Sequence, residues 1–250
     1  MQILLADAKI MNKKSVSESL SVPMFQGFAE AIAREMAQME IEEIGNALAC
    51  NKKIASENWL RYQNFFVAEK MPAIMAYNGQ AYKHLKADSF SSKGLEFSQK
   101  HLWITSFLYG ILRPLDAISA YRIENNVRLK ATGNVPLNQF WRDKLTDVLI
   151  TSALEDDGTI LHLSTEEYEH LFDWNRVKKE LKVIQPLFYV KNKGVLKIQA
   201  VWAKSCRGAM ARYIIDNQVV NTSRLRSFSY EGFTFNSALG EDLFPHFVRE

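Results

Sequence analysis

Cations dominate one segment near the end of the chain. From residue 191 to residue 226 there are eight basic residues and a single acidic one, Asp216, so this segment carries a formal charge of +7. The net charge of the protein is +3, so the remaining residues sum to −4. Such asymmetry predicts a local anion-binding surface on a nearly neutral body, and the alternative is an ordinary solvated basic face.

The stretch AKSCRGAMARYIIDN (203–217) within this segment has the spacing of a helix. Three cations fall on one side of that helix: Lys204, Arg207 and Arg212. If the helix begins near Lys204, free backbone N–H groups lie beside two of these cations, which suits a phosphate or a carboxylate. Gly208 stands where Ala would stabilise the helix more, and this favours a functional site over a plain surface helix. Cys206 falls on the apolar side, which indicates a buried small side chain rather than a nucleophile.

A second polar group follows an apolar strand, in the sequence LYGILRPLD. Pro114 disfavours helical geometry at Arg113, so we expect a rigid turn that projects polar side chains. The candidates, for ligand contacts or for structural ion pairs, are Arg113 with Asp116 and Arg122 with Glu124. An isolated ion pair at the surface stabilises a protein little, and the spacing alone favours neither interpretation.

Other chemistries find little support. The five histidines are scattered, and the two cysteines cannot form a cysteine-only zinc site or a disulfide scaffold. The sequence holds no Walker loop, no G-x-G-x-x-G and no G-x-S-x-G. We therefore expect no metal ion and no cofactor, and no motif identifies a reaction.

Strands and helices alternate along the chain and must position these residues. Strands are predicted at 2–6, 72–77, 101–107 and 159–163, and a hairpin pairs 187–190 with 195–202. Helical spacing begins at Ser21 and recurs over 41–49, around 59–66, up to residue 100 and over 137–149. Ser164-Thr165-Glu166-Glu167 is typical of a capping box. With no repeat and no Pro- or Ser-rich linker, the pattern predicts one α/β (α+β) domain over residues 1–250, with a mixed β-sheet.

The composition is that of a folded soluble protein. Hydrophobic residues make up 47%, charged residues 24% and aromatic residues 12%, which is enough for a substantial core. The chain starts without a basic region before its short apolar run, and no apolar stretch approaches the ~20 residues of a membrane span. We expect a cytoplasmic protein without a signal peptide or a membrane partner.

Several segments resemble, in the same order, the YaaA family of peroxide stress proteins. They run from Ile3 to Phe235 and are ILLADAKIMN, LYGILRPLDAISAYRIE, LNQFWRDKL, LSTEEY, VWAKSCRGAMARYIIDN and SYEGFTF. The resemblance implies a cytoplasmic bacterial protein with an unusual fold, a single domain built around a β-sheet ringed by helices. It also implies DNA binding through a positively charged cleft, a helix-hairpin-helix element, protection from hydrogen peroxide, lowered free iron and recombinational repair.

The resemblance carries a set of polar positions over to this chain. The expected DNA-binding residues are Lys9, Arg113, Arg122, Lys204, Arg207 and Arg212, and the other positions of the family pattern are Asp116, Tyr121, Trp141, Tyr168 and Glu231. One segment departs from the pattern. A helix-hairpin-helix turn needs two nearby glycines whose N–H groups approach phosphate, whereas the segment around Tyr109 has only Gly110, and Phe107 stands where a relative would have Gly.

Two hypotheses of function follow. The first is a DNA-binding protein of the oxidative stress response, which binds duplex or branched DNA through a basic cleft and mainly by phosphate contacts. The second is an enzyme that holds a small phosphorylated or nucleotide ligand in the same cleft. In that case Lys204 and Arg207 bind the anion, and Asp116 or Glu231 acts as acid or base. An iron-handling protein is a weaker third alternative, because the scattered histidines offer no iron site.

Overall fold

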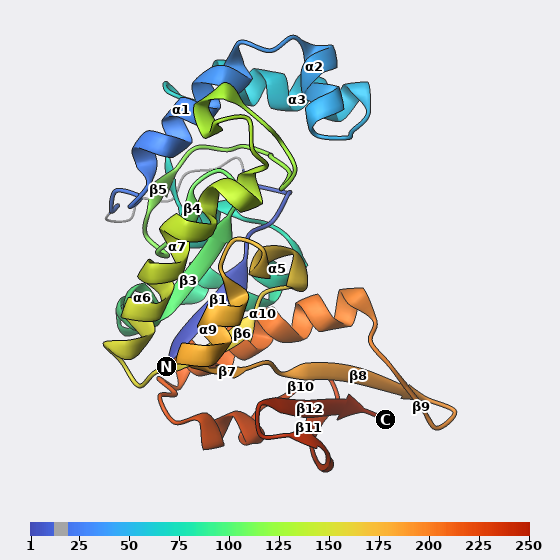
Figure 1. Ribbon diagram of the computed structural model, residues 1–250. Coiled ribbons are helices and arrows are strands. Elements are labelled where there is room, and N and C mark those ends of the chain that lie inside the picture. Colours follow the sequence, from blue (N-terminus) through green and yellow to red (C-terminus); the bar gives the residue numbers. More distant parts are fainter. Residues whose placement is uncertain (13–19) are drawn as a thin grey trace.

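The computed structural model describes residues 1–12 and 20–250. Within these residues two five-stranded sheets and one short two-stranded sheet are joined by helices (Figure 1). The first sheet lies in the middle of the molecule, and the second lies at the end that includes the C-terminus. Helix α10 (Ala200–Asp216) runs between them, and one contiguous hydrophobic core contains side chains of α10 and of both sheets.

The first sheet is built from short apolar segments. Its order is β4 (Gly110–Leu112), β3 (Leu102–Ser106), β1 (Gln2–Ala6), β6 (Thr159–Leu163) and β7 (Lys182–Ile184). Strand β1 is parallel to β3 and to β6, β6 is parallel to β7, and β4 is antiparallel to β3. All residues of β3 and β6 are buried, as expected for parallel strands with helices on both faces.

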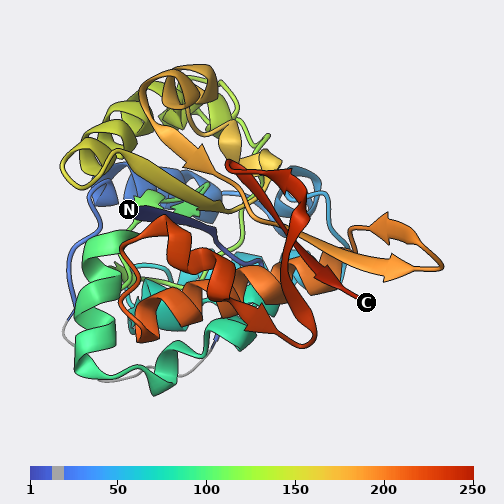
Figure 2. The same ribbon diagram turned by 90° about the horizontal axis from the view of Figure 1, so that it is seen from below.

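Helices cover both faces of the first sheet. Figure 2 shows α7 (Leu137–Leu154) and α9 (Trp174–Glu180) on one side of β1, and α6 (Ser92–His101) and α10 on the other. On α7 the side chains of Trp141, Leu145 and Leu149 recur every four residues and are fully buried. This apolar stripe holds α7 against the sheet.

The second sheet is antiparallel except for one pair. Its order is β10 (Ser229–Tyr230), β11 (Phe233–Glu241), β12 (Phe244–Arg249), β8 (Leu187–Asn192) and β9 (Val195–Lys197). Strand β12 is parallel to β8. The β8–β9 hairpin projects from the molecule (Figure 2) and turns at Lys193-Gly194, which both have positive φ. The sequence predicts this turn at Gly194, and the structure confirms it.

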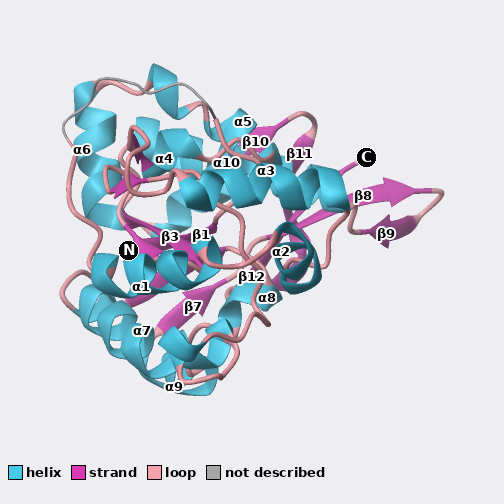
Figure 3. Ribbon diagram, turned by 90° about the horizontal axis from the view of Figure 1, so that it is seen from above, coloured by secondary structure: helices cyan, strands magenta, loops and turns pink. Residues whose placement is uncertain are grey.

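The remaining elements are short or lie far from the second sheet. Helices α1 (Gln26–Ala37), α2 (Ile41–Ala47) and α3 (Lys52–Gln63) form the opposite end of the molecule (Figures 1 and 3). The others are β2 (Met71–Pro72), which pairs with β5 (Ala117–Ile118), α4 (Ala73–Ala76), α5 (Gln80–Leu85), α8 (Glu166–Glu169) and the 3₁₀ turns at Ala87–Ser89, Lys130–Thr132 and Thr222–Ser227.

Three predicted boundaries are wrong because of tertiary pairing. The segment 72–77 is mostly helix α4 rather than a strand, since the N–H groups of Ala73 and Ile74 donate to carbonyls of the 114–116 turn. Helix α1 begins at Gln26, because the backbone of Ser21 pairs with residues 115 and 117. The second strand of the hairpin ends at Lys197 instead of residue 202, and helix α10 then buries Ala203 among core side chains.

Two short motifs, the capping box at 164–167 and the segment around Gly110, differ in the structure from the motifs they resemble. The capping box at 164–167 does not form, because Thr165 caps α8 without a side-chain hydrogen bond. The segment around Gly110 is the β3–β4 hairpin rather than a helix-hairpin-helix, in agreement with the departure of this segment from the family pattern. Gly110 has φ of 75°, and a Cβ there would lie 2.9 Å from the ring of Trp141. This glycine therefore serves a tight turn against α7.

Candidate anion-binding cavity

A cavity of about 320 Å³ opens at the carboxyl ends of β1 and β6. Its walls come from the residues after β1, the start of α5, the residues around α8, and α10. The polar side chains that line it are Asp7, Lys9, Gln80, Thr165, Glu167, Tyr168, Lys204 and Arg207. Strand β3 pairs with one edge of β1, and β6, which comes later in the chain, pairs with the other edge. The direction in which the sheet grows therefore reverses at β1. Ligands of open α/β sheets bind at the carboxyl ends of the strands at such a reversal.

Asp7 follows β1 directly and is half-buried in this cavity. Its backbone N–H donates to the carbonyl of Thr105 at 3.1 Å, which extends the β1–β3 pairing by one residue. One carboxylate oxygen accepts a hydrogen bond from the Tyr168 hydroxyl, and the other accepts one from the Tyr121 hydroxyl at 3.0 Å. Two tyrosines from different parts of the chain therefore orient this carboxyl group.

The surroundings of Asp7 change its acidity. Burial raises the pKa of Asp7 from 3.8 to about 6, although the hydrogen bonds from Tyr168 and Tyr121 act in the opposite direction. The negative charge of Glu167 raises this pKa further, and the positive charge of Lys9 lowers it. A carboxyl group that titrates near neutral pH inside a cavity is a candidate acid or base.

Lys204 and Arg207 lie one turn apart on α10, and both line the cavity. Lys204 is exposed, whereas Arg207 is half-buried, and the loss of hydration lowers the pKa of its guanidinium group. Within residues 1–12 and 20–250 neither cation forms an ion pair or a side-chain hydrogen bond. Two cations without partners beside a cavity form an arrangement that binds anions.

The prediction that free backbone N–H groups near Lys204 contribute to an anion site is wrong. Helix α10 begins at Ala200, so the N–H groups near Lys204 are bonded within the helix and only the side chains face the cavity. Gly208 also has a packing role instead of a functional one. A Cβ at this position would overlap the carbonyl group of Ala81, and the glycine therefore allows α10 to approach α5 closely.

A carboxylate binds two of the predicted DNA-binding cations. Glu124 accepts from the Lys9 ammonium at 2.6 Å and from the Arg122 guanidinium at 3.0 and 3.2 Å. Lys9 lines the cavity, and the Asn125 amide next to this cluster donates to Glu167 at 3.2 Å. The loop that carries Arg122 therefore borders the cavity, and Glu124 balances the positive charge of Arg122 within this loop.

Arg113 lies at the other end of the same strands. Its guanidinium group packs 3.4 Å from the ring centre of Trp103 and donates to Gln2 at 3.1 Å, to Ser152 at 3.3 Å and to the carbonyls of residues 100 and 102 at 3.2 Å. Asp116 accepts from the backbone N–H of Arg113 and from Ser21, both at 2.8 Å. These two residues shape the turn after β4 and do not face the cavity.

Several other predicted positions also make structural contacts. Arg212 pairs with Asp216 and donates to the carbonyl of Lys86 at 2.8 Å, which ties α10 to the end of α5. Trp141 is buried and donates to the carbonyl of Phe107 at 2.8 Å. The remaining position, Glu231, is exposed in the turn between β10 and β11 and does not line the cavity. Cys206 is buried, as the sequence predicts, and burial raises the pKa of its thiol to about 12.

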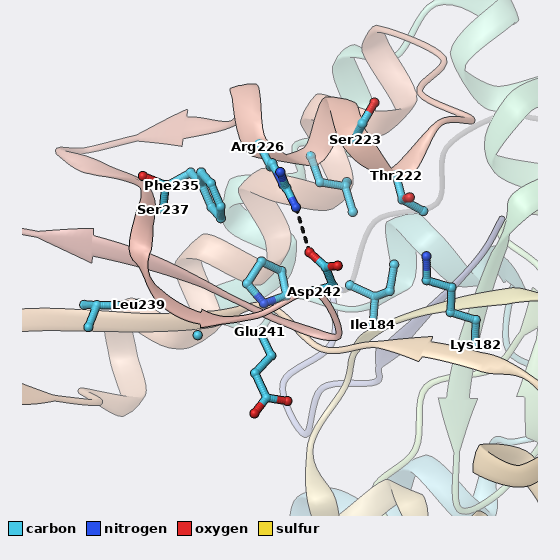
Figure 4. Close-up of a pocket in the computed structure, with 13 residues that line it drawn as sticks. Lys182, Ile184, Thr222, Ser223, Arg226, Phe235, Ser237, Leu239, Glu241 and Asp242 are labelled. Carbon is cyan, nitrogen blue, oxygen red and sulfur yellow. Dashed lines mark hydrogen bonds and ion pairs between the residues drawn. The ribbon is translucent and has the colours of Figure 1, made fainter.

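A second cavity, of about 350 Å³, lies beside the second sheet (Figure 4). The guanidinium group of Arg226 points across it and pairs with Asp242 at 2.8 Å. Both side chains are more than half exposed, so this ion pair is a weak, solvated contact. The cavity at β1 and β6 is the better candidate, because two of its three cations, Lys204 and Arg207, lack such partners among the described residues.

Sequence reasoning missed four of the eight polar lining residues as site residues: Asp7, Gln80, Thr165 and Glu167. Asp7 has a signal, since a polar residue directly after a buried parallel strand lies at the binding edge of the sheet. Gln80 and Glu167 have none, because only the folded chain brings them to the cavity. In the part of the chain that the structure describes, no group of three or more His, Cys, Asp or Glu side chains is arranged to hold a metal ion. Nor does any described helix combine the length and apolar character needed to cross a membrane.

The fold and the cavity define an α/β protein with a candidate ligand site at the carboxyl ends of parallel strands. Comparison with known proteins adds the family. The model of the family described as "Peroxide stress protein YaaA" matches residues 1–239, and the chain belongs to this family. A UPF0246 protein of Bacteroides thetaiotaomicron is 40% identical over 246 residues, which cover 97% of this chain and 96% of the relative.

More distant relatives also match along nearly their whole length. A UPF0246 protein of Porphyromonas gingivalis is 36% identical over 256 residues and covers both chains completely. One from Clostridium perfringens is 31% identical over 245 residues and covers 95% of each chain. The family description relates these proteins to peroxide stress, and the names of the relatives state no activity.

Proposed function

We propose that this protein of the peroxide stress family binds a small phosphorylated ligand in the cavity at the carboxyl ends of β1 and β6. The observation that carries the proposal is the pair of unpartnered cations, Lys204 and Arg207, beside the Asp7 carboxyl group. A guanidinium group binds two phosphate oxygens at once, and an ammonium group adds a compact charge. Removing the charge of Arg207 from water is costly, and a bound anion offsets that cost.

The size of the cavity supports a small ligand. Pockets for ligands of drug or nucleotide size have volumes of roughly 300–1,000 Å³, and this cavity measures about 320 Å³. A DNA duplex cannot enter a space of that size. Of the other predicted cations, Arg113 is held by buried and partly buried contacts and Arg212 by an ion pair with Asp216 and a hydrogen bond to the end of α5, so a single basic groove loses two of its six members.

Isothermal titration with inorganic phosphate, pyrophosphate and adenosine monophosphate tests the proposal. The wild type should bind at least one of them, and Arg207→Gln should weaken that binding about tenfold or more, because a charge-assisted contact is lost. Lys53→Gln is the matched control, since it removes one positive charge from an exposed position on α3, away from the cavity. No binding to the wild type, or equal losses in both variants, would contradict the proposal.

DNA is the second candidate ligand, and one feature favours it. The projecting β8–β9 hairpin (Figure 2) carries the exposed Lys193 and Lys197 and leads directly into α10, where Lys204 is exposed as well. Together with Lys9, Arg122 and Arg207 these lysines would contact phosphates without reading base sequence.

A mobility shift with duplex and branched DNA at two salt concentrations tests this candidate. Binding should weaken steeply with salt, and the double variant Lys193→Gln/Lys197→Gln should reduce the salt slope by about two. Binding that is insensitive to salt, or no binding, counts against DNA. The same double variant separates the candidates, because Lys193 and Lys197 do not line the cavity and their loss should leave pyrophosphate binding unchanged.

A further inference from the structure

The hydrogen bonds behind Asp7 begin at a serine hydroxyl. The Ser106 oxygen accepts from the backbone N–H groups of Leu108 at 3.2 Å and of Tyr109 at 3.0 Å. A hydroxyl group has two acceptor positions and one proton, so both acceptor positions are filled and the proton remains to be donated. The Tyr121 hydroxyl lies 2.6 Å away and receives it.

Only one assignment of donated and accepted hydrogen bonds then fits the contacts of the Tyr121 hydroxyl. It lies 3.0 Å from a carboxylate oxygen of Asp7 and 2.7 Å from the Tyr77 hydroxyl. A carboxylate accepts only, so Tyr121 donates its single proton to Asp7 and accepts from Ser106 and Tyr77. Tyr168 donates to the other carboxylate oxygen. Every proton of the network therefore points toward Asp7.

The phenols of this network keep their protons. Burial raises the pKa of Tyr77, Tyr121 and Tyr168 well above the ordinary value for tyrosine. The remaining acidic member, Asp7, loses its proton near neutral pH. Asp7 is also the member that follows β1 directly into the cavity, which Lys204 and Arg207 line as well.

We infer that Asp7 is the proton acceptor of the cavity and takes a proton from an O–H or N–H group of the phosphorylated ligand. The bond between the proton and the ligand's heteroatom breaks, its electron pair stays on that heteroatom, and an O–H bond forms on Asp7. Lys204 and Arg207 stabilise the negative charge that this transfer leaves on the ligand. The inference rests on the proposed function and narrows the ligand to a phosphorylated molecule with a proton-donating group.

The groups that face Asp7 set the balance of charge around it. They are Lys9 after the same strand, Tyr77 and Tyr121 from the loops behind it, Tyr82 from α5, Glu167 and Tyr168 from α8, and Lys204 and Arg207 from α10. Lys9 is paired with Glu124 at 2.6 Å, so the unpaired charges are Lys204 and Arg207 against Asp7 and Glu167, and the cavity gains a net positive charge when Asp7 takes up a proton.

Matched pairs of small phosphates test the role of Asp7. Alkyl phosphates of two, three and four carbons are compared by titration with their counterparts that carry a terminal hydroxyl group. The wild type should bind the hydroxyl-bearing member about tenfold more tightly for at least one length, because its hydroxyl donates to a carboxylate. In Asp7→Asn the preference should fall to about threefold or less, because a neutral amide oxygen accepts more weakly than a carboxylate, and Arg207→Gln should weaken the binding of both members.

The outcomes separate the inference from the proposed function. If the wild type binds none of these phosphates, the proposed function fails. If it binds them without preference at every length, or if Asp7→Asn keeps the full preference, phosphate binding stands and the role of Asp7 is overturned.

Carbon-13 NMR of the aspartate carboxyl groups is a second measurement, with the Asp7 signal assigned by its absence in Asp7→Asn. Tyr168→Phe should move the titration of Asp7 to higher pH and weaken the preference for the hydroxyl-bearing phosphate, because the carboxylate loses a donor. An unchanged titration would show that the network does not act on Asp7 and would overturn the inference.

Discussion

Two arginines at opposite ends of the first sheet show how position decides the role of the same side chain. At the amino ends of β1 and β3, Arg113 stacks on Trp103, and its guanidinium group donates to four protein oxygens. At the carboxyl ends of β1 and β6, Arg207 lines a cavity without a protein partner among the described residues. Burial lowers the pKa of both guanidinium groups, to about 10 for Arg113. Both are therefore desolvated, and only one has its hydrogen bonds satisfied by the fold.

The difference teaches how to separate a structural cation from a binding one. A buried guanidinium group with filled hydrogen bonds contributes to stability, and its removal leaves several polar atoms unpaired. A desolvated guanidinium group with open hydrogen-bond positions costs stability and persists when a ligand uses it. The following predictions test this contrast.

The largest expected effect concerns the helix that holds Arg207 in place. Gly208→Ala should destabilise the protein by about 3 kcal/mol or more, because the new methyl group meets the backbone of Ala81 and pushes α10 from α5. Gly27→Ala in α1 is the control, since no atom lies within 4 Å of a Cβ there. It should stabilise by up to about 1 kcal/mol. Urea unfolding measures both, and equal effects would refute the packing role of Gly208.

Removal of the structural arginine comes next. Arg113→Leu should lower the free energy of unfolding by about 3 kcal/mol, because Gln2, Ser152 and two carbonyl groups lose their donor and Trp103 loses a stacked cation. Phosphate affinity of the folded protein should not change. Chemical unfolding and titration calorimetry provide the two readings. If Arg113→Leu weakened phosphate binding without lowering the free energy of unfolding, Arg113 would be a binding residue rather than a structural one.

The pH dependence of stability probes the carboxyl group beside the binding arginine. The folded protein holds the Asp7 proton up to a pH of about 6, whereas an ordinary aspartate loses it near 3.8. Since the folded state binds more protons in this window, the free energy of unfolding should fall as pH rises from about 4 to about 6, by roughly 2–3 kcal/mol, and then level off.

Asp7→Asn has no proton to lose and should lack this decline. Urea unfolding of both proteins at several pH values between 4 and 8 measures the difference. Parallel curves for the wild type and the variant would show that Asp7 is not the titrating group.

The smallest change in stability is expected for the binding arginine itself. Arg207→Gln should alter the free energy of unfolding by less than about 1 kcal/mol, or raise it slightly, because no protein hydrogen bond is lost and a desolvated charge is removed. Thermal unfolding in phosphate-free buffer measures this. Destabilisation as large as that of Arg113→Leu would mean that Arg207 is a structural residue too.

The three central strands of the first sheet, β1, β3 and β6, were predictable, whereas its edge strands β4 and β7 and some elements nearby were not. Continuous apolar runs such as QILLA and TILHL bury both faces, so their local pattern is sufficient. The segment 72–77 has a similar pattern, but the 114–116 turn takes its backbone N–H groups. A pattern along the chain holds no information about such distant partners.

The residues predicted for the candidate site also fall into two groups, those that line the cavity and those that make structural contacts elsewhere. Sequence reasoning selected Lys9, Tyr168, Lys204 and Arg207, and the structure brings these four residues to one cavity. It also selected Arg113 and Arg212. Arg113 donates to Gln2, more than a hundred residues away, and Arg212 donates to the distant carbonyl of Lys86 in addition to its ion pair with Asp216 on the same helix. Cations look alike in a sequence, because what distinguishes them is whether a neighbour in space takes up their hydrogen bonds. The DNA-binding role of these residues stays a prediction.

The walls of the cavity are drawn from almost the full length of the chain. Arg207 follows Asp7 by two hundred residues, so one wall of the cavity is synthesised long before the other. Strand β1 must wait for β3 and then for β6 before its buried edges are paired. Contacts so distant in sequence form late and slowly, since long loops must close first. The newly made protein thus acquires this cavity only after α10 has been synthesised, and any premature stop before α10 yields a chain without it.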